Sequence, residues 1–171
     1  MACPTLTEIA QACERNSGGL FNAWFGDMDD ILTITENSAT FNVTAMTAAN
    51  APISMNIKRK TSNYTDEITE DTVVGSSTGL LTVTLAVHRR AKDKSYALNV
   101  LGAGQRYLYG ILEDANGKFW YGKYLQLTTN GGGSGTARAD GSNYNVVLVA
   151  DTDHTMYEID SAVVTTLLAT S

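Results

Sequence analysis

The sequence predicts a mainly β protein with one or two helices, of the α+β class, in which an antiparallel two-sheet β-sandwich or barrel carries a flanking helix. Composition is the first reason: of 171 residues only 18% are charged, whereas 22 are Thr and 15 are Gly. Alternation is the second, because several segments switch between apolar and polar residues at successive positions. The third is that helical spacing occurs between strands and does not follow each of them. We therefore expect residues 1–171 to form a single domain.

The N-terminal segment predicts a short helix followed by strands. Thr5 and Glu8 form a capping box, apolar residues follow at helical spacing up to Cys13, and residues 16–19 end the helix. Three further elements are expected in order: an apolar strand at 20–25, a turn at 27–30, and a hairpin of 31–35 with 39–44.

Residues 53–70 are predicted to form one long β feature. Apolar residues alternate with polar ones from Ile53 to Ile57, and the phase is opposite from Tyr64 onward, which requires a turn or bulge near residues 60–63. The feature is basic at 58–60 and acidic at 66–71, and a flexible break follows at 75–79.

The second half of the chain carries the clearest strand and the clearest interior helix. Residues 81–88 alternate strictly, and residues 90–101 predict a helix that Gly102 and Gly104 end. The apolar face of this helix is expected to consist of Tyr96, Ala97, Val100 and Leu101.

The remaining segments predict further strands. Residues 107–112 are apolar on both faces and therefore need cover on both sides. Asn116-Gly117 predicts a tight turn, because this pair supplies the positive φ angles of a type I′ hairpin. The other expected elements are a return strand at 119–125, a loop at 130–135, a strand at 144–149, and one more strand from 156–159 with 162–168.

Charge and cysteine usage exclude several classes of protein. A formal net charge of −6 and a pI near 4.8 argue against a reader of duplex DNA and against an anionic-membrane surface helix. Cys3 and Cys13 would close only a short loop, so we expect free thiols. We find neither a signal peptide nor an apolar run of the roughly 18 residues that a membrane span needs, and expect a protein made in a cytoplasm.

Each candidate chemical site is explained better as an ordinary structural element, such as a strand end, a turn or a loop. His88 ends a strand without a readable triad, and His154 lies in an acidic turn that lacks the ligands of a calcium loop. The Gly-rich run 131–135 lacks the Gly-Lys-Ser/Thr of a phosphate loop, and Asp27 to Asp30 fit a turn. We therefore predict no catalytic residues, no cofactor and no metal, and a protein that is not an enzyme.

Aromatic and basic clusters leave two interpretations open. The cluster Tyr107, Tyr109, Phe119, Trp120, Tyr121 and Tyr124 fits core and subunit contacts better than stacking on bases or sugars. The small basic patches at 58–60 and 89–94 are expected to meet acidic segments 66–71 and 151–160 of a neighbouring subunit instead of nucleic acid.

An ordered series of motifs resembles a known family. The series runs Leu112–Gly122 (LEDANGKFWYG), a Gly-rich loop, Thr136–Gly141 (TARADG), Tyr144–Leu148 (YNVVL) and Tyr157–Asp160 (YEID), and Cys13-x-x-Asn16-x-Gly-Gly-Leu20 precedes it. In this order the chain resembles small structural proteins of tailed bacteriophages, of the tail tube (major tail) type seen in phages of gut Bacteroides relatives. The motifs are turn and strand residues that cover most of the chain and include no active site.

The resemblance implies a two-sheet β-sandwich whose copies close into hexameric rings that stack into a conduit for DNA. Residues 53–70 would be an extended hairpin arm and residues 1–19 an N-terminal arm, both contacting other subunits or other virion proteins. The expected subunit-interface residues are Ile53, Met55, Ile57, Tyr64, Ile68, Leu6 and Ile9.

The acidic balance suggests how DNA would pass through such a conduit. A six-subunit ring would carry about −36 charges, and acidic residues facing the lumen would repel phosphates. The candidates are Asp66, Glu67, Glu70 and Glu113. The function we expect is that of a virion tail tube subunit, assembled in the host bacterial cytoplasm, without a membrane anchor and without specific DNA binding. The alternatives are a tail-completion, ring or auxiliary capsid protein, and a glycan-binding β-sandwich that uses the 107–124 aromatics.

Overall fold

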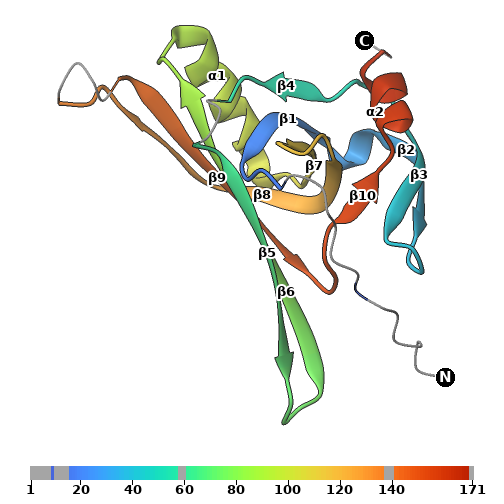
Figure 1. The fold of residues 1–171 in the computed structure, drawn as a ribbon. Helices are drawn as coiled ribbons and strands as arrows, with labels where there is room; N and C mark the ends of the chain where they lie inside the picture. Colours follow the sequence, from blue (N-terminus) through green and yellow to red (C-terminus); the bar gives the residue numbers. More distant parts are fainter. Residues whose placement is uncertain (1–8, 10–15, 58–60, 137–140, 170–171) are drawn as a thin grey trace.

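The computed structural model describes Ile9 and residues 16–57, 61–136 and 141–169, and these form a mainly β fold with two α-helices (Figure 1). The α-helices are α1 (Lys92–Leu101) and α2 (Ser161–Leu168), and the two 3₁₀ turns are η1 (Met28–Asp30) and η2 (Ala103–Gln105). The strands are β1 (Leu20–Asp27), β2 (Ile31–Asn37), β3 (Asn42–Ala48), β4 (Ile53–Met55), β5 (Asn63–Asp71), β6 (Ser76–His88), β7 (Leu108–Asp114), β8 (Phe119–Gly133), β9 (Asn143–Thr152) and β10 (Tyr157–Ile159).

Two sheets share the long strand β8. Sheet A has the order β2-β3-β10-β8-β7-β1-β4, and sheet B has the order β5-β6-β9-β8. All neighbours are antiparallel except β10 and β3, which pair in parallel at Glu158 and Asn42. The prediction of a mainly β protein with one or two helices is confirmed, and the sheet does not close on itself within the described residues.

Strand β8 changes sheets at Tyr124. Residues 119–125 pair with β7, whereas residues 126–133 pair with β9. The register shifts between the Gly122 and Leu125 pairs, and Tyr124 has a φ of 58°, which is unusual for a residue with a Cβ. A bulge of this kind bends the strand and redirects its side chains, so the second half of β8 leaves sheet A and becomes an edge of sheet B.

The first hydrophobic core draws on both sheets. Strand β6 contributes alternate residues from Leu81 to Val87, and strand β9 contributes alternate residues from Tyr144 to Ala150. Sheet A supplies Phe25 and Leu112, and α1 supplies Leu98. The strict alternation read from residues 81–88 is therefore confirmed as one buried face and one outward face.

A second core covers the other face of sheet A. Tyr109 and Ile111 of β7 point into this core, whereas Leu108 and Leu112 of the same strand point into the first. Helix α2 closes the second core with Val164 and Leu167. The expectation that residues 107–112 are covered on both sides is confirmed.

The hairpin arm is formed by a different segment from the one predicted. Residues 53–70 do not pair with each other: β4 pairs with β1 in sheet A, whereas β5 pairs with β6 in sheet B along its whole length, from Asn63–Thr84 to Asp71–Ser76. The extended hairpin is therefore 63–88, with its turn at 72–75, and it projects beyond the body of the molecule (Figure 1). The predicted break at 75–79 is wrong for residues 76–79, which belong to β6, where Gly79 pairs with both Ile68 and Thr152.

The strand predicted from 156–159 with 162–168 is confirmed in its first part, which is β10, and wrong in its second, which is helix α2. The β-branched run from Val163 to Thr166 suggested a strand. The Thr165 and Thr166 hydroxyls instead donate to the carbonyls four residues earlier, at 2.8 and 2.9 Å, and the helix buries one apolar stripe on the second core. Tertiary packing has overridden the local propensity.

The Gly-rich run is mostly strand where we predicted a loop. Residues 131–133 continue β8 and pair with Asn143 to Asn145 of β9. A Cβ on Gly132 would lie 2.6 Å from the backbone oxygen of Asn143, so a close approach of the two strands accounts for glycine here.

The other elements predicted from the sequence are present in part. The 31–44 hairpin, the helix opening near residue 90 and a tight turn at Asn116-Gly117 are confirmed. The predicted type I′ geometry is wrong, because Gly117 has a φ of 77° whereas Asn116 does not have a positive φ. The expected apolar face of α1 is right for Leu101, which packs against the first core. It is wrong in omitting Leu98, the buried residue of that helix, and in including Tyr96, which is 74% exposed. The expected N-terminal helix at 5–13 and the thiols of Cys3 and Cys13 lie outside the described residues. No described helix has the length and apolar character to span a membrane.

Candidate assembly surface

Sheet B presents two strand edges that no other described strand pairs with. Strand β5 pairs only with β6, and residues 126–133 of β8 pair only with β9. Each edge leaves a row of backbone N–H and C=O groups that can pair with another strand. Because the strands of sheet B alternate in direction, the two edges also run in opposite directions.

The outward face of sheet B carries no positive charge. The registers place Glu67, Leu80 and Asp151 on this face, in one row across β5, β6 and β9. The strand residues 63–71, 76–88, 126–133 and 143–152 contain no Lys or Arg. The other side chains on the face are mainly hydroxyls and short apolar groups: Thr65, Thr69, Thr78, Thr82, Thr84, Ala86, Thr128, Val147 and Val149.

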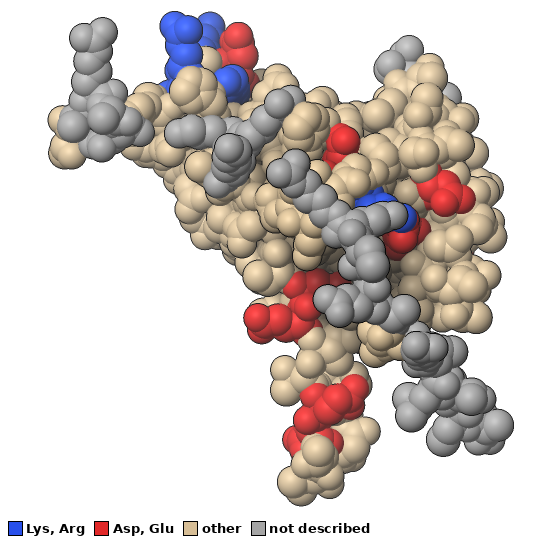
Figure 2. Space-filling model, in the orientation of Figure 1, with Lys and Arg blue, Asp and Glu red and all other residues tan. Residues whose placement is uncertain are grey.

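The tip of the β5–β6 hairpin is an ordered turn that exposes two valines. The Asp71 carboxylate accepts from the backbone N–H groups of Val73 at 2.8 Å and Val74 at 3.1 Å. These hydrogen bonds, to Val74 first, lower the pKa of Asp71, so its carboxylate stays ionised. Val73 is 92% exposed and Val74 is 75% exposed. Figure 2 shows acidic side chains along this hairpin and a group of Lys and Arg at the opposite end of the molecule, near α1.

The four predicted lumen acids lie on different surfaces. Glu67 is on the outward face of sheet B, where it was expected to act. Asp66 lies on the opposite face and accepts a hydrogen bond from the backbone N–H of Met156 at 2.6 Å. Glu70 shares that opposite face, and Glu113 belongs to β7 of sheet A, where the Asn22 side chain donates to it. The four residues therefore do not share one face of a sheet, and Glu67 is the one on the outward face of sheet B. That they face a lumen stays a prediction.

The predicted interface residues also separate. Met55, Ile57 and Tyr64 pack against the first core, so part of their apolar surface is used within the chain. Burial, together with the nearby Asp114 and Asp66 carboxylates, raises the pKa of the Tyr64 hydroxyl. Ile68 on the hairpin is 37% exposed, whereas Ile53 on β4 is 70% exposed and Ile9 is 97% exposed. Leu6 lies outside the described residues.

An apolar groove between β4 and α1 was not predicted. A cavity of about 160 Å³ has Phe25, Met55 and Leu98 in its lining, and Ile53 and Ala97 line both this cavity and a neighbouring one of about 460 Å³. We name the two together the β4–α1 groove. One signal in the sequence could have indicated this groove. The apolar stripe predicted for the helix, Tyr96, Ala97, Val100 and Leu101, is wider than the surface of α1 that is buried.

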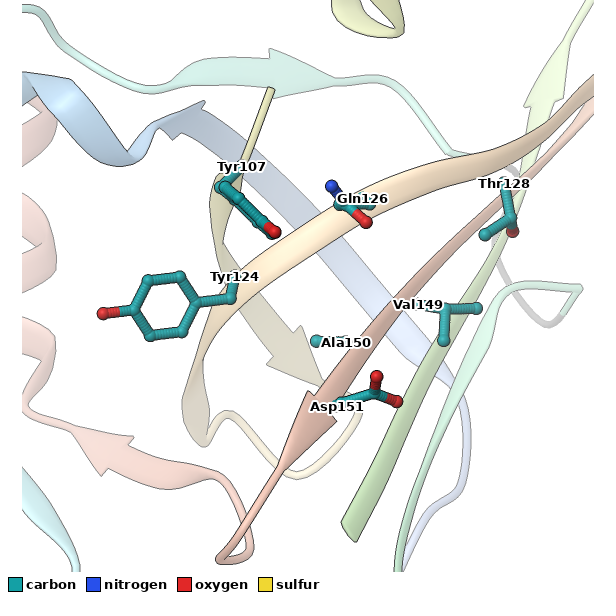
Figure 3. Close-up of a pocket in the computed structure, with 7 residues that line it drawn as sticks. All are labelled: Tyr107, Tyr124, Gln126, Thr128, Val149, Ala150 and Asp151. Carbon is teal, nitrogen blue, oxygen red and sulfur yellow. The ribbon is translucent and has the colours of Figure 1, made fainter. Parts of the chain in front are cut away.

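The aromatic cluster divides between the interior and one shallow cleft. Tyr109 and Tyr121 are buried in the second core. Tyr107 and Tyr124 are about half exposed, and their rings lie edge to face with centroids 5.9 Å apart. They line an open cleft of about 480 Å³ that also includes Gln126, Thr128, Val149, Ala150 and Asp151 (Figure 3).

The described residues show no grouping typical of a metal centre. Within this part of the chain, no three His, Cys, Asp or Glu side chains are placed to hold a metal ion. His154 contacts the carbonyl of Thr155 at 2.7 Å and packs edge-on against Tyr157, which fits the acidic turn expected there. The candidate functional surfaces are the open edges, the outward face and the hairpin of sheet B.

No protein-family model, no curated protein and no solved structure matches this chain.

Proposed function

We propose that the chain is a virion structural protein, the tail tube subunit of a tailed bacteriophage, whose two-sheet β-sandwich closes into hexameric rings that stack into a conduit for DNA. The observation that carries the proposal is the pair of open edges on sheet B, at β5 and at residues 126–133 of β8. Unpaired edges are a liability for a monomer, whereas a closed ring of copies removes them. The family resemblance of the sequence supports the same arrangement.

Strand direction favours closure of sheet B from copy to copy. A rotation about an axis roughly parallel to the strands preserves their directions, so β5 of one copy meets β8 of the next as an antiparallel neighbour. Every junction around the ring is then equivalent, which is what a cyclic assembly requires.

The outward face of sheet B suits a lumen wall. Its acidic members are Glu67, Asp71 and Asp151, and its strands hold no Lys or Arg. Such a surface offers no ionic partner to the phosphates of DNA and repels them weakly, so the nucleic acid slides without binding.

The test is the assembly state of the purified full chain. We expect light scattering to give a multiple of the 18.3 kDa subunit and negative-stain images to show rings or tubes. A companion variant replaces residues 68–79 with Asn-Gly, which joins the paired residues Glu67 and Leu80 by a two-residue turn and shortens the β5 edge. This variant should keep its circular dichroism spectrum and lose assembly. A wild-type chain that stays monomeric in all conditions would refute the proposal.

A second candidate function rests on the Tyr107–Tyr124 cleft. Two exposed aromatic rings beside the Asp151 carboxylate and the Gln126 amide form a set that suits a sugar, because rings stack on its apolar face while polar groups bind hydroxyls (Figure 3). A monomer that binds glycans, and loses that binding when Tyr107 and Tyr124 are both changed to Ala, would favour this function over tube assembly.

A further inference from the structure

We infer that Asn116-Gly117 is a site of spontaneous deamidation, and that the segment 16–19 controls when the reaction occurs. The pair forms the turn between β7 and β8, and the segment leads into β1. The side-chain amide of Asn116 is the point at which these two parts of the chain meet. Deamidation here goes beyond the proposed tube function and does not depend on it.

Deamidation at an Asn-Gly pair needs only water. The backbone nitrogen of Gly117 bonds to Cγ of Asn116 while the Cγ–Nδ2 bond breaks, and Nδ2 leaves as ammonia with the proton of the Gly117 N–H. Water then opens the resulting succinimide at either of its two carbonyls, which gives aspartate or isoaspartate with one added negative charge. Glycine favours the first step, because it has no Cβ to hinder the approach of its nitrogen.

The turn is open to water and leaves room for this reaction. Asn116 and Gly117 are both exposed, and a Cβ built on Gly117 would meet no atom within 4 Å. A polar cleft of about 380 Å³ lies against the turn, and Ser17, Asp114 and Asn116 are among the residues that line it. Water therefore reaches the group that the second step hydrolyses.

The segment 16–19 holds the Asn116 side chain in a position that delays the reaction. Oδ1 of Asn116 accepts from the backbone N–H of Ser17 at 2.7 Å, and Nδ2 donates to Asn16 Oδ1 at 3.3 Å. The Gly117 N–H donates to the Asp114 carbonyl at 3.1 Å, so the attacking nitrogen is also engaged. Cyclisation rotates Cγ toward that nitrogen and detaches Nδ2, so both side-chain hydrogen bonds are lost on the way. The reaction rate therefore follows the fraction of molecules in which the segment has detached locally.

The products do not restore the same contacts. A carboxylate at position 116 has no proton to donate to Asn16 Oδ1, and it places a second negative charge in the cleft that Asp114 lines. Isoaspartate changes the turn further, because the main chain then runs through the former side-chain carbon and the acceptor for the Ser17 N–H becomes a backbone carbonyl. Because ammonia is lost, the change is irreversible, and a segment that has detached for long enough to react is held more weakly afterwards.

A proline at position 17 tests the control by the segment. Ser17→Pro removes the N–H that donates to Asn116 Oδ1, whereas the matched control Ser17→Ala keeps it. The purified full chains are held in mildly alkaline buffer, and peptide mapping by mass spectrometry quantifies aspartate and isoaspartate at position 116 over time. We expect Ser17→Pro to react about two- to tenfold faster than Ser17→Ala, which corresponds to the loss of one hydrogen bond.

Asn16→Ala gives a second measurement that leaves the backbone unchanged. This variant removes the acceptor of the Asn116 Nδ2 hydrogen bond and should also speed deamidation at position 116. Asn130-Gly131 is the internal reference, because it pairs with β9 and takes no part in the contacts of Asn16 and Ser17 with the turn. The deamidation rate at position 130 should be the same in every variant.

The modified wild-type chain tests the effect on the segment. Anion-exchange chromatography separates this chain by its additional negative charge. Hydrogen exchange at the backbone amides of residues 17–19 should be faster than in the unmodified chain, since the contacts with Asn116 are lost. Unchanged exchange would overturn the weaker holding of the segment.

Rates at position 116 decide whether the site and its control exist. Equal rates in Ser17→Pro, Asn16→Ala, Ser17→Ala and the wild type would overturn control by the segment. An Asn116 that stays unmodified in every folded variant, over a period that converts the urea-unfolded chain, would overturn the site itself. If Ser17→Pro speeds the reaction at position 130 as well, the chain has unfolded generally and the Asn16→Ala rate decides. Each of these results leaves the proposed tube function standing.

Discussion

The two sheets of this protein share β8 and are used in opposite ways. Strands β7 and β1 of sheet A are covered on both faces, by the first core on one side and by the second core on the other. Sheet B is covered on one face, leaves both edges without a described partner strand, and extends into a hairpin beyond the body. Both sheets therefore stabilise the subunit through the first core. Sheet B in addition has an uncovered face and open edges, through which we propose that it contacts other copies.

The largest predicted effect is a difference in the free energy of unfolding between two truncations, one of a buried leucine in sheet A and one of an outward-facing leucine in sheet B. Leu112 on β7 is fully buried, so Leu112→Ala is expected to lower the free energy of unfolding by about 2–5 kcal/mol. Leu80 on β6 is 45% exposed on the outward face, so Leu80→Ala should change it by no more than about 0.5 kcal/mol. Urea unfolding of both variants at low protein concentration measures the difference. Equal losses of unfolding free energy would contradict the description of Leu80 as lying on an uncovered face.

Reversing charge on the outward face of sheet B should cause the assembled protein to bind DNA. With Glu67→Lys and Asp151→Lys, each subunit gains two cations on the proposed lumen wall. We expect DNA binding that weakens with salt, with a slope of log K against log salt steeper by about 0.9 for each phosphate contacted. Retention of labelled DNA by assembled protein at several salt concentrations provides the measurement.

The control for that experiment keeps the same net charge. Asp29→Lys and Asp93→Lys place the two cations on η1 and on α1, which packs against the inner face of sheet B, so neither lies on the outward face. This variant should bind DNA no more strongly than the wild type when the DNA has access only to the lumen. Identical binding by the two variants would remove the link between the outward face and DNA passage.

Local patterns in the sequence predicted the elements better than their partners. Strict alternation at 81–88 and the Asn116-Gly117 pair are short-range signals, and they predicted the strand and the position of the turn correctly. The turn type was wrong, because only Gly117 of the pair has a positive φ. The hairpin of 63–88 was missed because the phase change near residue 62 marks a crossing from sheet A to sheet B, which the alternation alone does not distinguish from a turn within one hairpin.

The candidate surface was less accessible to sequence reasoning, because it depends on register. Glu67 and Asp66 are neighbours in the chain, yet pairing with Leu80 and Leu81 places them on opposite faces of the sheet. The β4–α1 groove arises from residues about 40 positions apart, such as Ile53 and Ala97, so no local pattern indicates it.

The smallest effects concern two buried tyrosines, one in each sheet. Burial, aided by the nearby Asp30 carboxylate, raises the pKa of Tyr109 to about 12, and its hydroxyl has no hydrogen-bond partner among the described residues. In β9, the hydrogen bond with Ser95 Oγ at 2.5 Å is the main reason that the pKa of Tyr144 is lowered. The tyrosine of sheet A is therefore held neutral, whereas that of sheet B is stabilised as the anion.

Removing each hydroxyl should change the alkaline stability in opposite directions. An unfolded tyrosine ionises near pH 10, so the neutral form of Tyr109 favours folding below that pH and the advantage is lost as the pH rises toward about 12. Tyr109→Phe should change stability at pH 7 by less than about 1 kcal/mol and flatten its decline above pH 10. Tyr144→Phe should lower the stability at pH 7, because a hydrogen bond is lost, and steepen that decline, because the lowered pKa contributes stability as the pH rises through it. Urea unfolding between pH 7 and 11 measures both, and curves that shift in the same direction would contradict the contrast between the two sheets.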